Sequence, residues 1–465
     1  MPALRDRLQR IFTVEPVVFF FMTGTFILTP ASQQLVIVKV CVELYGNASL
    51  CSDPQRSDAY AEIQRGASHI LLAYAGTLSL VSIPPAILLG SWSDRAGRKL
   101  GMALPSLLSL VTGGVLIAMV LVKDASPYWV VAAALATGVS GGYVSVFLSC
   151  FSYVADVTDA GSRTLRMALV EAMVFLGGMV GFLLGGALLQ QRSGFLAAFG
   201  AYCACHVLSL LYVLLWLRSP APAGRPGPDA GPGGEEGPGG GGVPSGLPLL
   251  RYARLSFRAV LRKRPDQERL KLHFLILCTF LNNVIAVGDQ CILLLFLTYK
   301  PREFTTALYG VFNSTRMLLL GLIVSLMGLF PLLMRCVGEM TLAKMSAFSR
   351  GVSYILLAFS TNTWMVFLVA LVGAPAGITQ AVIRSLSSAI VEPDEQGAMF
   401  SFMASMEALC ILVAASIFNG IYPLTLESFP GLVFILMAGF SFIILIFMQW
   451  ISEMPTTHPR LLIQD

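Results

Sequence analysis

Five ionisable side chains lie inside long apolar stretches of this chain and could do chemistry there: Glu171, Asp289, Arg316, Arg384 and Glu407. A charge at membrane depth is energetically costly, so such a side chain normally faces a cavity or an ionic partner. Surroundings of low dielectric constant disfavour the charged form of a carboxyl group, which allows that group to bind a proton. The set therefore predicts proton binding by its acids and anion binding by its arginines.

Glu171 and Asp289 are the predicted proton-coupling acids. Glu171 follows Arg163 and Arg166 by a few residues, so a structural ion pair with an arginine is the alternative interpretation. Asp289 follows Gly288, and a position near the outer end of its span, where water would solvate it, is an equally good interpretation.

Arg384 and Arg316 are the predicted substrate-binding cations, because a guanidinium pairs with a carboxylate through two parallel hydrogen bonds. Arg384 follows Gly373–Gly377, a helix-breaking segment. Arg316 could instead pair with an acid on a neighbouring helix. Glu407 joins the substrate-binding set, and the mixture of cations and acids predicts a polar, anionic solute.

A basic string, Gly90-x-x-x-Asp94-Arg95-x-Gly97-Arg98-Lys99, lies between two of the apolar stretches. It resembles the loop signature of the major facilitator superfamily of secondary transporters. Asp94 could accept hydrogen bonds from a helix N-terminus, and Arg98 and Lys99 could reach carboxylates of the opposite half. Such contacts suit a gate that forms in one state and breaks in another. An ordinary basic turn that fixes membrane topology is the alternative.

The elements that position these residues are expected to be membrane-spanning helices. The chain has 465 residues, of which 56% are hydrophobic and only 12% are charged, whereas a soluble domain carries about a quarter charged residues. Apolar runs of about 18 or more residues can each cross a bilayer as a helix. Twelve spans are expected, at Pro16–Val38, Ser68–Gly90, Gly101–Val122, Pro127–Ser152, Arg166–Leu188, Phe195–Leu217, Leu272–Leu297, Thr305–Met334, Thr341–Ser360, Trp364–Val391, Phe402–Tyr422 and Phe429–Trp450.

The predicted fold class is thus an all-α membrane protein, with twelve transmembrane helices in two six-helix halves. A Pro/Gly-rich tract, Ser219–Gly246, separates the halves and cannot bury a core. The expected organisation is a tail (1–15), a first half (16–218), a linker (219–271), a second half (272–451) and a second tail (452–465). The basic stretch Arg251–Arg264 of the linker is either an amphipathic helix on anionic lipid or, as we favour, solvated charge that fixes topology.

Arginine and lysine placement predicts the orientation of the spans. Basic residues gather in the first tail, in the loop after the second span and in the central linker, which puts both termini in the cytosol. The first interspan loop then lies outside, where Asn47-Ala-Ser49 is a glycosylation acceptor pattern. The net charge of +5 is therefore a sign of topology, and no nucleic-acid partner is expected.

The nine cysteines show no metal-binding pattern, so no metal site is expected and buried free thiols are the default interpretation. Cys41 is placed among these buried thiols. Cys51 is the clear exofacial cysteine, with no exofacial partner in the sequence. His206 and His273 are interpreted as structural residues.

Five segments narrow the resemblance to one family: Val14-Glu15-Pro16, Tyr153–Val157, Arg163–Glu171, Ile383–Ser387 with Glu395–Gly397, and Ile417–Pro423. Together they resemble solute carrier family 46, which contains a proton-coupled folate transporter, a thymic stromal cotransporter and a lysosomal member. The resemblance implies a twelve-helix transporter with a glycosylated first loop. It also implies that Glu171 acts in proton coupling and Arg384 in substrate and proton binding. It places Asp156 among the acids needed for transport, here grouped with the proton-coupling residues.

The sequence departs from the folate member of that family at informative positions. The seventh span reads Asn282–Asp289 where that member has a histidine, and Leu297–Tyr309 lacks the cysteine that would pair with the first loop. The fold and the transport class are compatible with these changes, whereas folate itself becomes doubtful as the substrate.

The predicted function is proton-coupled symport of a small organic anion, such as folate or an antifolate, by alternating access. It needs no cofactor beyond a proton gradient, and its partners are the anion, protons and the lipid bilayer. The expected site is the plasma membrane or the endosome and lysosome. Four alternatives stay open: a carrier of muropeptides or polar conjugates, an uncoupled facilitator, a non-transporting solute sensor and, least supported, a membrane-bound enzyme, for which no nucleophile–histidine–acid arrangement is evident.

Overall fold

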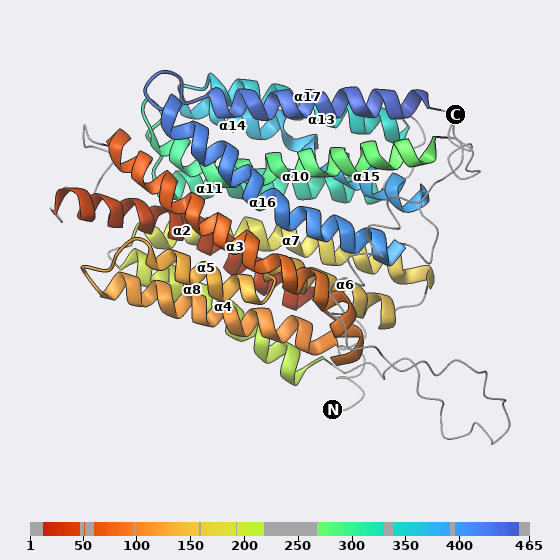
Figure 1. The fold of residues 1–465 in the computed structure, drawn as a ribbon, viewed down its shortest axis with the longest axis horizontal. Helices are drawn as coiled ribbons and strands as arrows, with labels where there is room; N and C mark the ends of the chain where they lie inside the picture. Colours follow the sequence, from red (N-terminus) through yellow and green to blue (C-terminus); the bar gives the residue numbers. More distant parts are fainter. Residues whose placement is uncertain are drawn as a thin grey trace.

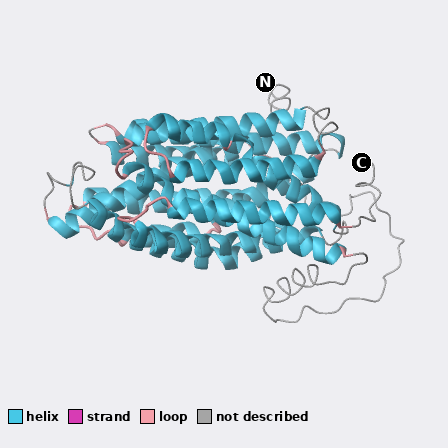
Figure 2. Cartoon of the chain, turned by 90° about the horizontal axis from the view of Figure 1, so that it is seen from above, coloured by secondary structure: helices cyan, strands magenta, loops and turns pink. Residues whose placement is uncertain are grey.

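The computed structural model describes residues 13–46, 51, 60–96, 98–157, 160–191, 193–217, 267–329, 338–390 and 396–454. Within these ranges every regular element is a helix, and the helices run along the long axis of the molecule (Figures 1 and 2). The predicted all-α fold is therefore confirmed. The described chain ends, near Thr13 and Met454, lie at one end of the bundle, on the right in Figure 1. We call this the proximal end and the opposite end the distal end.

The first half contains one helix or helix pair for each predicted span. The helices are α2 (Glu15–Tyr45), α3 (Tyr60–Ala96), α4 (Arg98–Leu121), α5 (Trp129–Val139), α6 (Gly142–Val157), α7 (Ala160–Leu189) and α8 (Gly194–Leu215). The predicted span Pro127–Ser152 is present as the membrane-length segment Trp129–Val154, but it consists of two helices, because Gly141 and Gly142 both have positive φ angles, 72° and 57°. Glycine adopts that region without a steric penalty, so the chain breaks between α5 and α6.

The second half repeats this plan. Its helices are α10 (Glu268–Thr298), α11 (Thr306–Leu329), α13 (Glu339–Ala358), α14 (Thr363–Val372), the 3₁₀ helix η3 (Ala374–Ala376), α15 (Gly377–Ile390), α16 (Gln396–Thr425) and α17 (Leu432–Glu453). The predicted helix break at Gly373–Gly377 is present as η3. Within the described part of the chain, eleven spans, with α5–α6 and α14–α15 counted as one each, are long and apolar enough to cross a membrane. Helix α13, at the predicted span Thr341–Ser360, does not meet this criterion, and it carries Lys344 and Arg350.

Two helix pairs join the halves: α7 packs along α11, and α3 packs along α16. Glycines allow the closest approach, since a Cβ atom at Gly310 of α11 would lie 2.5 Å from the carbonyl oxygen of Phe182 and 3.0 Å from Cα of Gly186. The two backbones are so close here that position 310 can hold only a residue without a Cβ atom, which is glycine.

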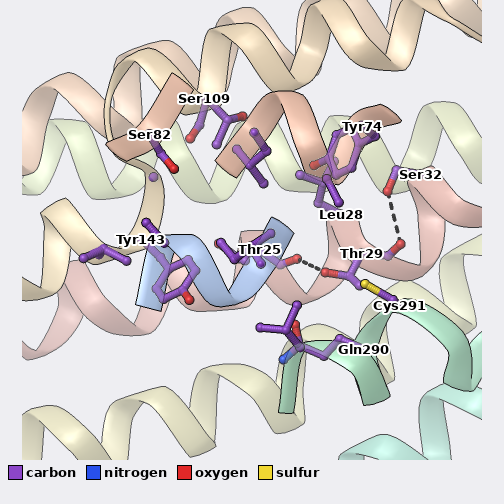
Figure 3. Close-up of a pocket in the computed structure, with 18 of the residues that line it drawn as sticks. Thr25, Leu28, Thr29, Ser32, Tyr74, Ser82, Ser109, Tyr143, Gln290 and Cys291 are labelled. Atoms are coloured by element: carbon purple, nitrogen blue, oxygen red, sulfur yellow. Dashed lines mark hydrogen bonds between the residues drawn. The ribbon is translucent and has the colours of Figure 1, made fainter. Parts of the chain in front are cut away.

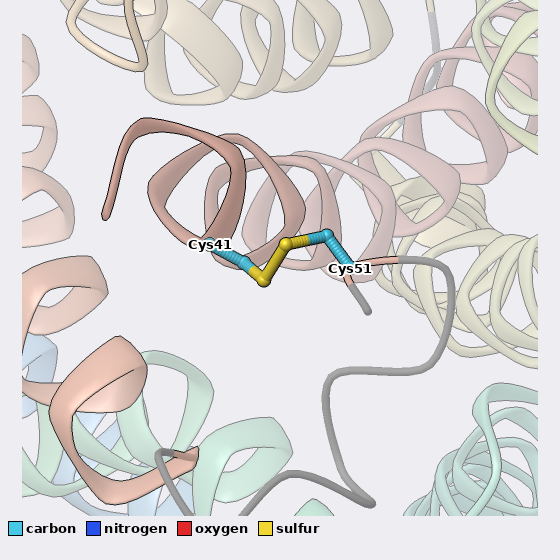
Figure 4. The surroundings of a disulfide bond; sticks show 2 residues. All are labelled: Cys41 and Cys51. Atoms are coloured by element: carbon cyan, nitrogen blue, oxygen red, sulfur yellow. A yellow bond between two sulfur atoms is a disulfide. The ribbon is translucent and has the colours of Figure 1, made fainter. Parts of the chain in front are cut away.

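A disulfide joins Cys41 to Cys51 (Figure 4). The prediction that Cys41 is a buried free thiol and that Cys51 has no partner was wrong. The predicted span ended at Val38, but α2 continues to Tyr45 and carries Cys41 to its distal end. There Cys41 meets Cys51 with a Cα–Cα distance of 5.7 Å.

Candidate functional site

A cavity of about 190 Å³ lies between the halves. Its wall comes mainly from the first half, through α2 to α6 and α8, while α10 and α16 of the second half close it. Figure 3 shows hydroxyl, amide and aromatic groups converging on the space. The polar lining residues are Thr25, Thr29, Ser32, Gln33, Tyr74, Ser82, Ser109, Thr137, Tyr143, Tyr202, Gln290 and Cys291.

None of the described residues that line this cavity is an Asp, Glu, Lys, Arg or His. Several hydroxyl protons are used locally: Thr29 donates to the Thr25 carbonyl and Ser32 to the Thr29 carbonyl, both at 3.1 Å. These hydroxyl oxygens still have lone pairs that can accept hydrogen bonds. The cavity therefore suits an uncharged, largely apolar body with a few hydrogen-bonding groups.

The charged residues predicted from the sequence lie beside this cavity, in two groups. The first contains Glu171 of α7 and Arg384 of α15, which come from opposite halves and form an ion pair with 3.6 Å between Oε1 and Nη1. Their side chains are 46% and 49% exposed, so neither is sealed inside the protein. The structure thus brings together the acid and the arginine that the sequence analysis singled out for protons and substrate.

Glu407 belongs to the same group. It lies on α16 within electrostatic range of Arg384. Tyr143 of α6 interacts electrostatically with both Glu407 and Arg384, and it also lines the cavity (Figure 3). Through Tyr143, the group of Glu171, Arg384 and Glu407 adjoins the uncharged cavity.

The second group lies within the second half. Arg316 of α11 forms an ion pair with Asp289 of α10 at 2.8 Å, and Tyr354 of α13 lies within electrostatic range of both. Asp289 is only 8% exposed, and its second oxygen, Oδ1, has no donor among the described residues. Asp289 immediately precedes Gln290 on α10, and Gln290 lines the cavity.

Arg166, one of the two arginines that the sequence suggested as a structural partner of Glu171, pairs with another acid. Arg166 pairs with Glu15 at 3.1 Å, and the backbone N–H of Thr13 donates to the same carboxylate at 2.6 Å. This contact joins α7 to the start of α2 at the proximal end of the first half.

The distal end of the bundle is closed by hydrogen bonds between the halves. Gln64 of α3 donates to the Leu295 carbonyl at 2.8 Å and accepts from the Tyr422 hydroxyl at 3.1 Å, while Tyr60 donates to Thr298 at 2.8 Å. We call Tyr60, Gln64, Thr298 and Tyr422 the distal lock. All four side chains are buried, so the structure shows a state that is closed at this end.

Several predicted residues fall outside what the structure describes. The side chains of Gly90–Asp94 and of Asp156 are not described, and neither are Gly97 or Asn47. Arg98 and Lys99 open α4 at the proximal end and are partly exposed. Their predicted gating role therefore stays a prediction.

Sequence reasoning missed the cavity hydroxyls, the distal lock and Arg350. Serine, threonine and glutamine in apolar helices give no signal that distinguishes a cavity wall from a helix contact. Arg350 did carry a signal, because it lies within the predicted span Thr341–Ser360 and meets the criterion used for Arg316 and Arg384.

A family model describing the major facilitator superfamily matches residues 15–415, most of the chain. The chain belongs to the major facilitator superfamily. The protein is therefore an integral membrane transporter and not an enzyme, as its sequence predicted. Two further comparisons agree with this assignment.

Curated relatives resemble this transporter over nearly its whole length. It is 28% identical to the proton-coupled folate transporter of Rattus norvegicus, over 96% of this chain and 93% of that protein. It is 26% identical to the lysosomal proton-coupled steroid conjugate and bile acid symporter SLC46A3 of Gallus gallus, over 96% and 94%. These relatives confirm the predicted resemblance to solute carrier family 46.

Solved structures confirm the fold. The human organic anion transporter MFSD10 (TETRAN) matches with a TM-score of 0.64 and 18% identity, over 94% of this chain and 99% of that one. The POT family transporter PepTSo matches with a TM-score of 0.62 and 14% identity, over 97% and 98%. At such identities the likeness shows the fold alone.

Proposed function

We propose that this transporter is a proton-coupled symporter of a small organic anion. The observation that carries the proposal is the ion pair between Glu171 and Arg384, which joins opposite halves beside the central cavity. Protonation of Glu171 removes the negative partner of Arg384, so the guanidinium becomes available to an incoming anion. Deprotonation restores the pair and displaces the anion. Proton and anion are then bound and released together.

Alternating access completes the cycle. The distal lock and the α7–α11 contact hold the halves together at the distal end in the observed state. Rocking of the halves would open this end and expose the cavity to the other side of the membrane. With cytosolic termini, as arginine placement predicts, the distal end faces the exterior or an organelle lumen. The first loop then carries glycan at Asn47, and transport runs from the acidic side toward the cytosol.

Asp289 is proposed as a second protonation site. Arg316 holds one carboxylate oxygen, and the other is buried without a donor among the described residues, so this second oxygen is the one proposed to take up the proton. Arg316 is then the counter-ion of Asp289, which leaves Arg384 as the cation that meets the anion. Protons supply the driving force, and the proposal needs no cofactor.

The cavity favours one of two candidate substrates. The relatives are named for folate and for steroid conjugates and bile acids. The uncharged, largely apolar wall fits the fused-ring body of a steroid conjugate, whose single anionic group could reach Arg384. Folate carries two carboxylates and a polar ring system, so it is the second candidate.

Uptake of both probes tests the proposal. Cells or proteoliposomes with matched amounts of wild type or Glu171→Gln would receive labelled taurocholate or methotrexate at about pH 5.5 and about pH 7.4. Wild-type uptake that is faster at the acidic pH, with the stimulation absent in Glu171→Gln, supports proton-coupled anion symport. Equal uptake at both pH values, or no uptake of either probe into proteoliposomes, contradicts it.

A further inference from the structure

Arg384 lies on α15, a helix whose rotation is not fixed by a continuous helical backbone. The tenth span is broken at η3, so α15 is a separate helix of 14 residues. A continuous helix would fix the rotation of its second part through backbone hydrogen bonds. At a break, lateral contacts must fix that rotation, and with it the direction in which Arg384 points.

Helix α13 supplies contacts at the break itself. Ser346 donates to the Pro375 carbonyl at 2.7 Å, and Ser349 donates to the Val372 carbonyl, so α13 is bonded to the backbone on both sides of the break. Thr379 at the start of α15 donates to Ser346 at 2.7 Å. These bonds anchor the beginning of α15 but lie more than one turn before Arg384.

A second chain of bonds reaches α15 further along. Arg350 of α13 donates through Nη1 to the Asn282 side-chain oxygen, and Asn282 of α10 donates to Gln380 Oε1 at 2.7 Å. Gln380 and Arg384 are four residues apart on α15, so they lie one turn apart on the same face. The strut formed by Arg350, Asn282 and Gln380 therefore ends one turn from the ion pair with Glu171.

Arg350 fixes which groups donate and which accept along this strut. A guanidinium has donors and no acceptor, so Asn282 must present its oxygen to Arg350 and its N–H group to Gln380. Gln380 must then present its oxygen toward α10. A neutral amide at position 350 could reverse both side-chain amides, whereas the guanidinium allows only one arrangement.

Among the described residues, Arg350 has no carboxylate partner of the kind that Arg316 and Arg384 have. It is 6% exposed, it donates to the Asn282 side-chain oxygen and to the Ser441 hydroxyl at 3.3 Å, and its Nη2 has no acceptor within that part of the chain. Burying a guanidinium is costly. The other two second-half arginines singled out above, Arg316 and Arg384, each have a carboxylate.

We propose that Arg350 is a positioning residue that acts through Asn282 and Gln380 to hold Arg384 of α15 opposite Glu171. This inference rests on the proposed role of Arg384 in anion binding. In this proposal neither Arg350 nor Gln380 touches the substrate; both act by positioning Arg384. Loss of the strut lets α15 rotate, so Arg384 meets both Glu171 and the anion less often.

The first experiment measures the position of α15 without any substrate. Glu171→Cys and Arg384→Cys are combined, and their crosslinking by a short bifunctional thiol reagent is timed in membranes, with each single-cysteine variant as background. Adding Gln380→Leu or Arg350→Met should slow crosslinking about fivefold, in line with the loss of one hydrogen bond. Lys344→Met is the matched control, because Lys344 lies on α13 but bonds to Gln449 of α17. Equal rates in Gln380→Leu and Lys344→Met overturn the proposal.

The second experiment connects position to transport of labelled taurocholate and methotrexate. Gln380→Leu should raise KM about fivefold with little change in Vmax, and Arg350→Lys should restore part of what Arg350→Met loses. In an Arg384→Gln background, Gln380→Leu should change nothing further, because the residue it positions is gone. An equal rise in KM in both backgrounds overturns the positioning role. If crosslinking slows but Arg384→Gln leaves KM unchanged, the positioning role of the strut is supported and the proposed role of Arg384 in anion binding is contradicted.

Discussion

Arg384 of α15 lies 3.6 Å from Glu171 of α7, and this ion pair connects the two halves of the transporter beside its uncharged cavity. An anion and the Glu171 carboxylate are alternative partners for the same guanidinium. A proton on Glu171 decides between them, which gives a direct physical link between proton binding and anion binding.

Arg384→Gln should weaken anion binding by about 10- to 100-fold, since a hydrogen bond to a charged group contributes about 1.5–3 kcal/mol. KM for the transported probe reports the loss. Arg384→Lys keeps the charge without the planar pair of donors and should fall between wild type and Arg384→Gln. An unchanged KM in both variants would mean that the anion is held elsewhere.

Tyr422→Phe should favour opening at the distal end, because it removes a buried bond to Gln64. The loss of one such bond, about 0.5–1.5 kcal/mol, shifts the population of open molecules about 2- to 10-fold. Cys291 lines the cavity and can report this shift through labelling by a membrane-impermeant thiol reagent added from the distal side. Cys291→Ser gives the background, and no gain in labelling in Tyr422→Phe would contradict the role of the distal lock.

Gly310→Ala should impair the closed state at the α7–α11 contact. Its new Cβ atom would lie 2.5 Å from the Phe182 carbonyl oxygen, and overpacking of this kind costs about 1–3 kcal/mol. Thermal unfolding of purified protein measures the effect. Gly200→Ala of α8 is the matched control, because nothing lies within 4 Å of its Cβ position. Similar melting temperatures for the two variants would show that the close contact is dispensable.

Cys41→Ser, Cys51→Ser and the double variant should lose the same stability. The disulfide closes a loop of 10 residues, and such a crosslink contributes about 2–3 kcal/mol through the unfolded state. Melting temperatures of the three variants, compared with wild type, test this. A double variant that loses clearly more than either single one would show that the two cysteines act independently.

Most of the fold could be predicted from the sequence because the membrane imposes it. Each run of apolar residues long enough to cross a bilayer must satisfy its backbone internally, and a helix does so. The break at Gly373–Gly377 was predictable, since Pro375 cannot donate a helical hydrogen bond. The break at Gly141–Gly142 was missed, because glycines also occur inside membrane helices and their φ angles depend on packing.

The candidate site was only partly predictable. Membrane depth marked Glu171, Asp289, Arg316 and Arg384 as chemically important, but not which acid meets which arginine. Glu171 and Arg384 lie in opposite halves and are more than 200 residues apart in the chain, so only the packed structure shows that they form a pair. Asn282 and Gln380 gain their roles from Arg350, and no local pattern in the sequence connects the three.

The most direct test of the account is proton movement driven by the anion. Proteoliposomes containing the purified transporter and an internal pH-sensitive dye receive taurocholate or methotrexate outside, without an imposed pH gradient. The account predicts that the interior acidifies with wild type, whereas Glu171→Gln exchanges labelled for unlabelled anion without moving protons. Anion exchange by wild type with no acidification, or acidification that persists in Glu171→Gln, would contradict proton coupling through the Glu171–Arg384 pair.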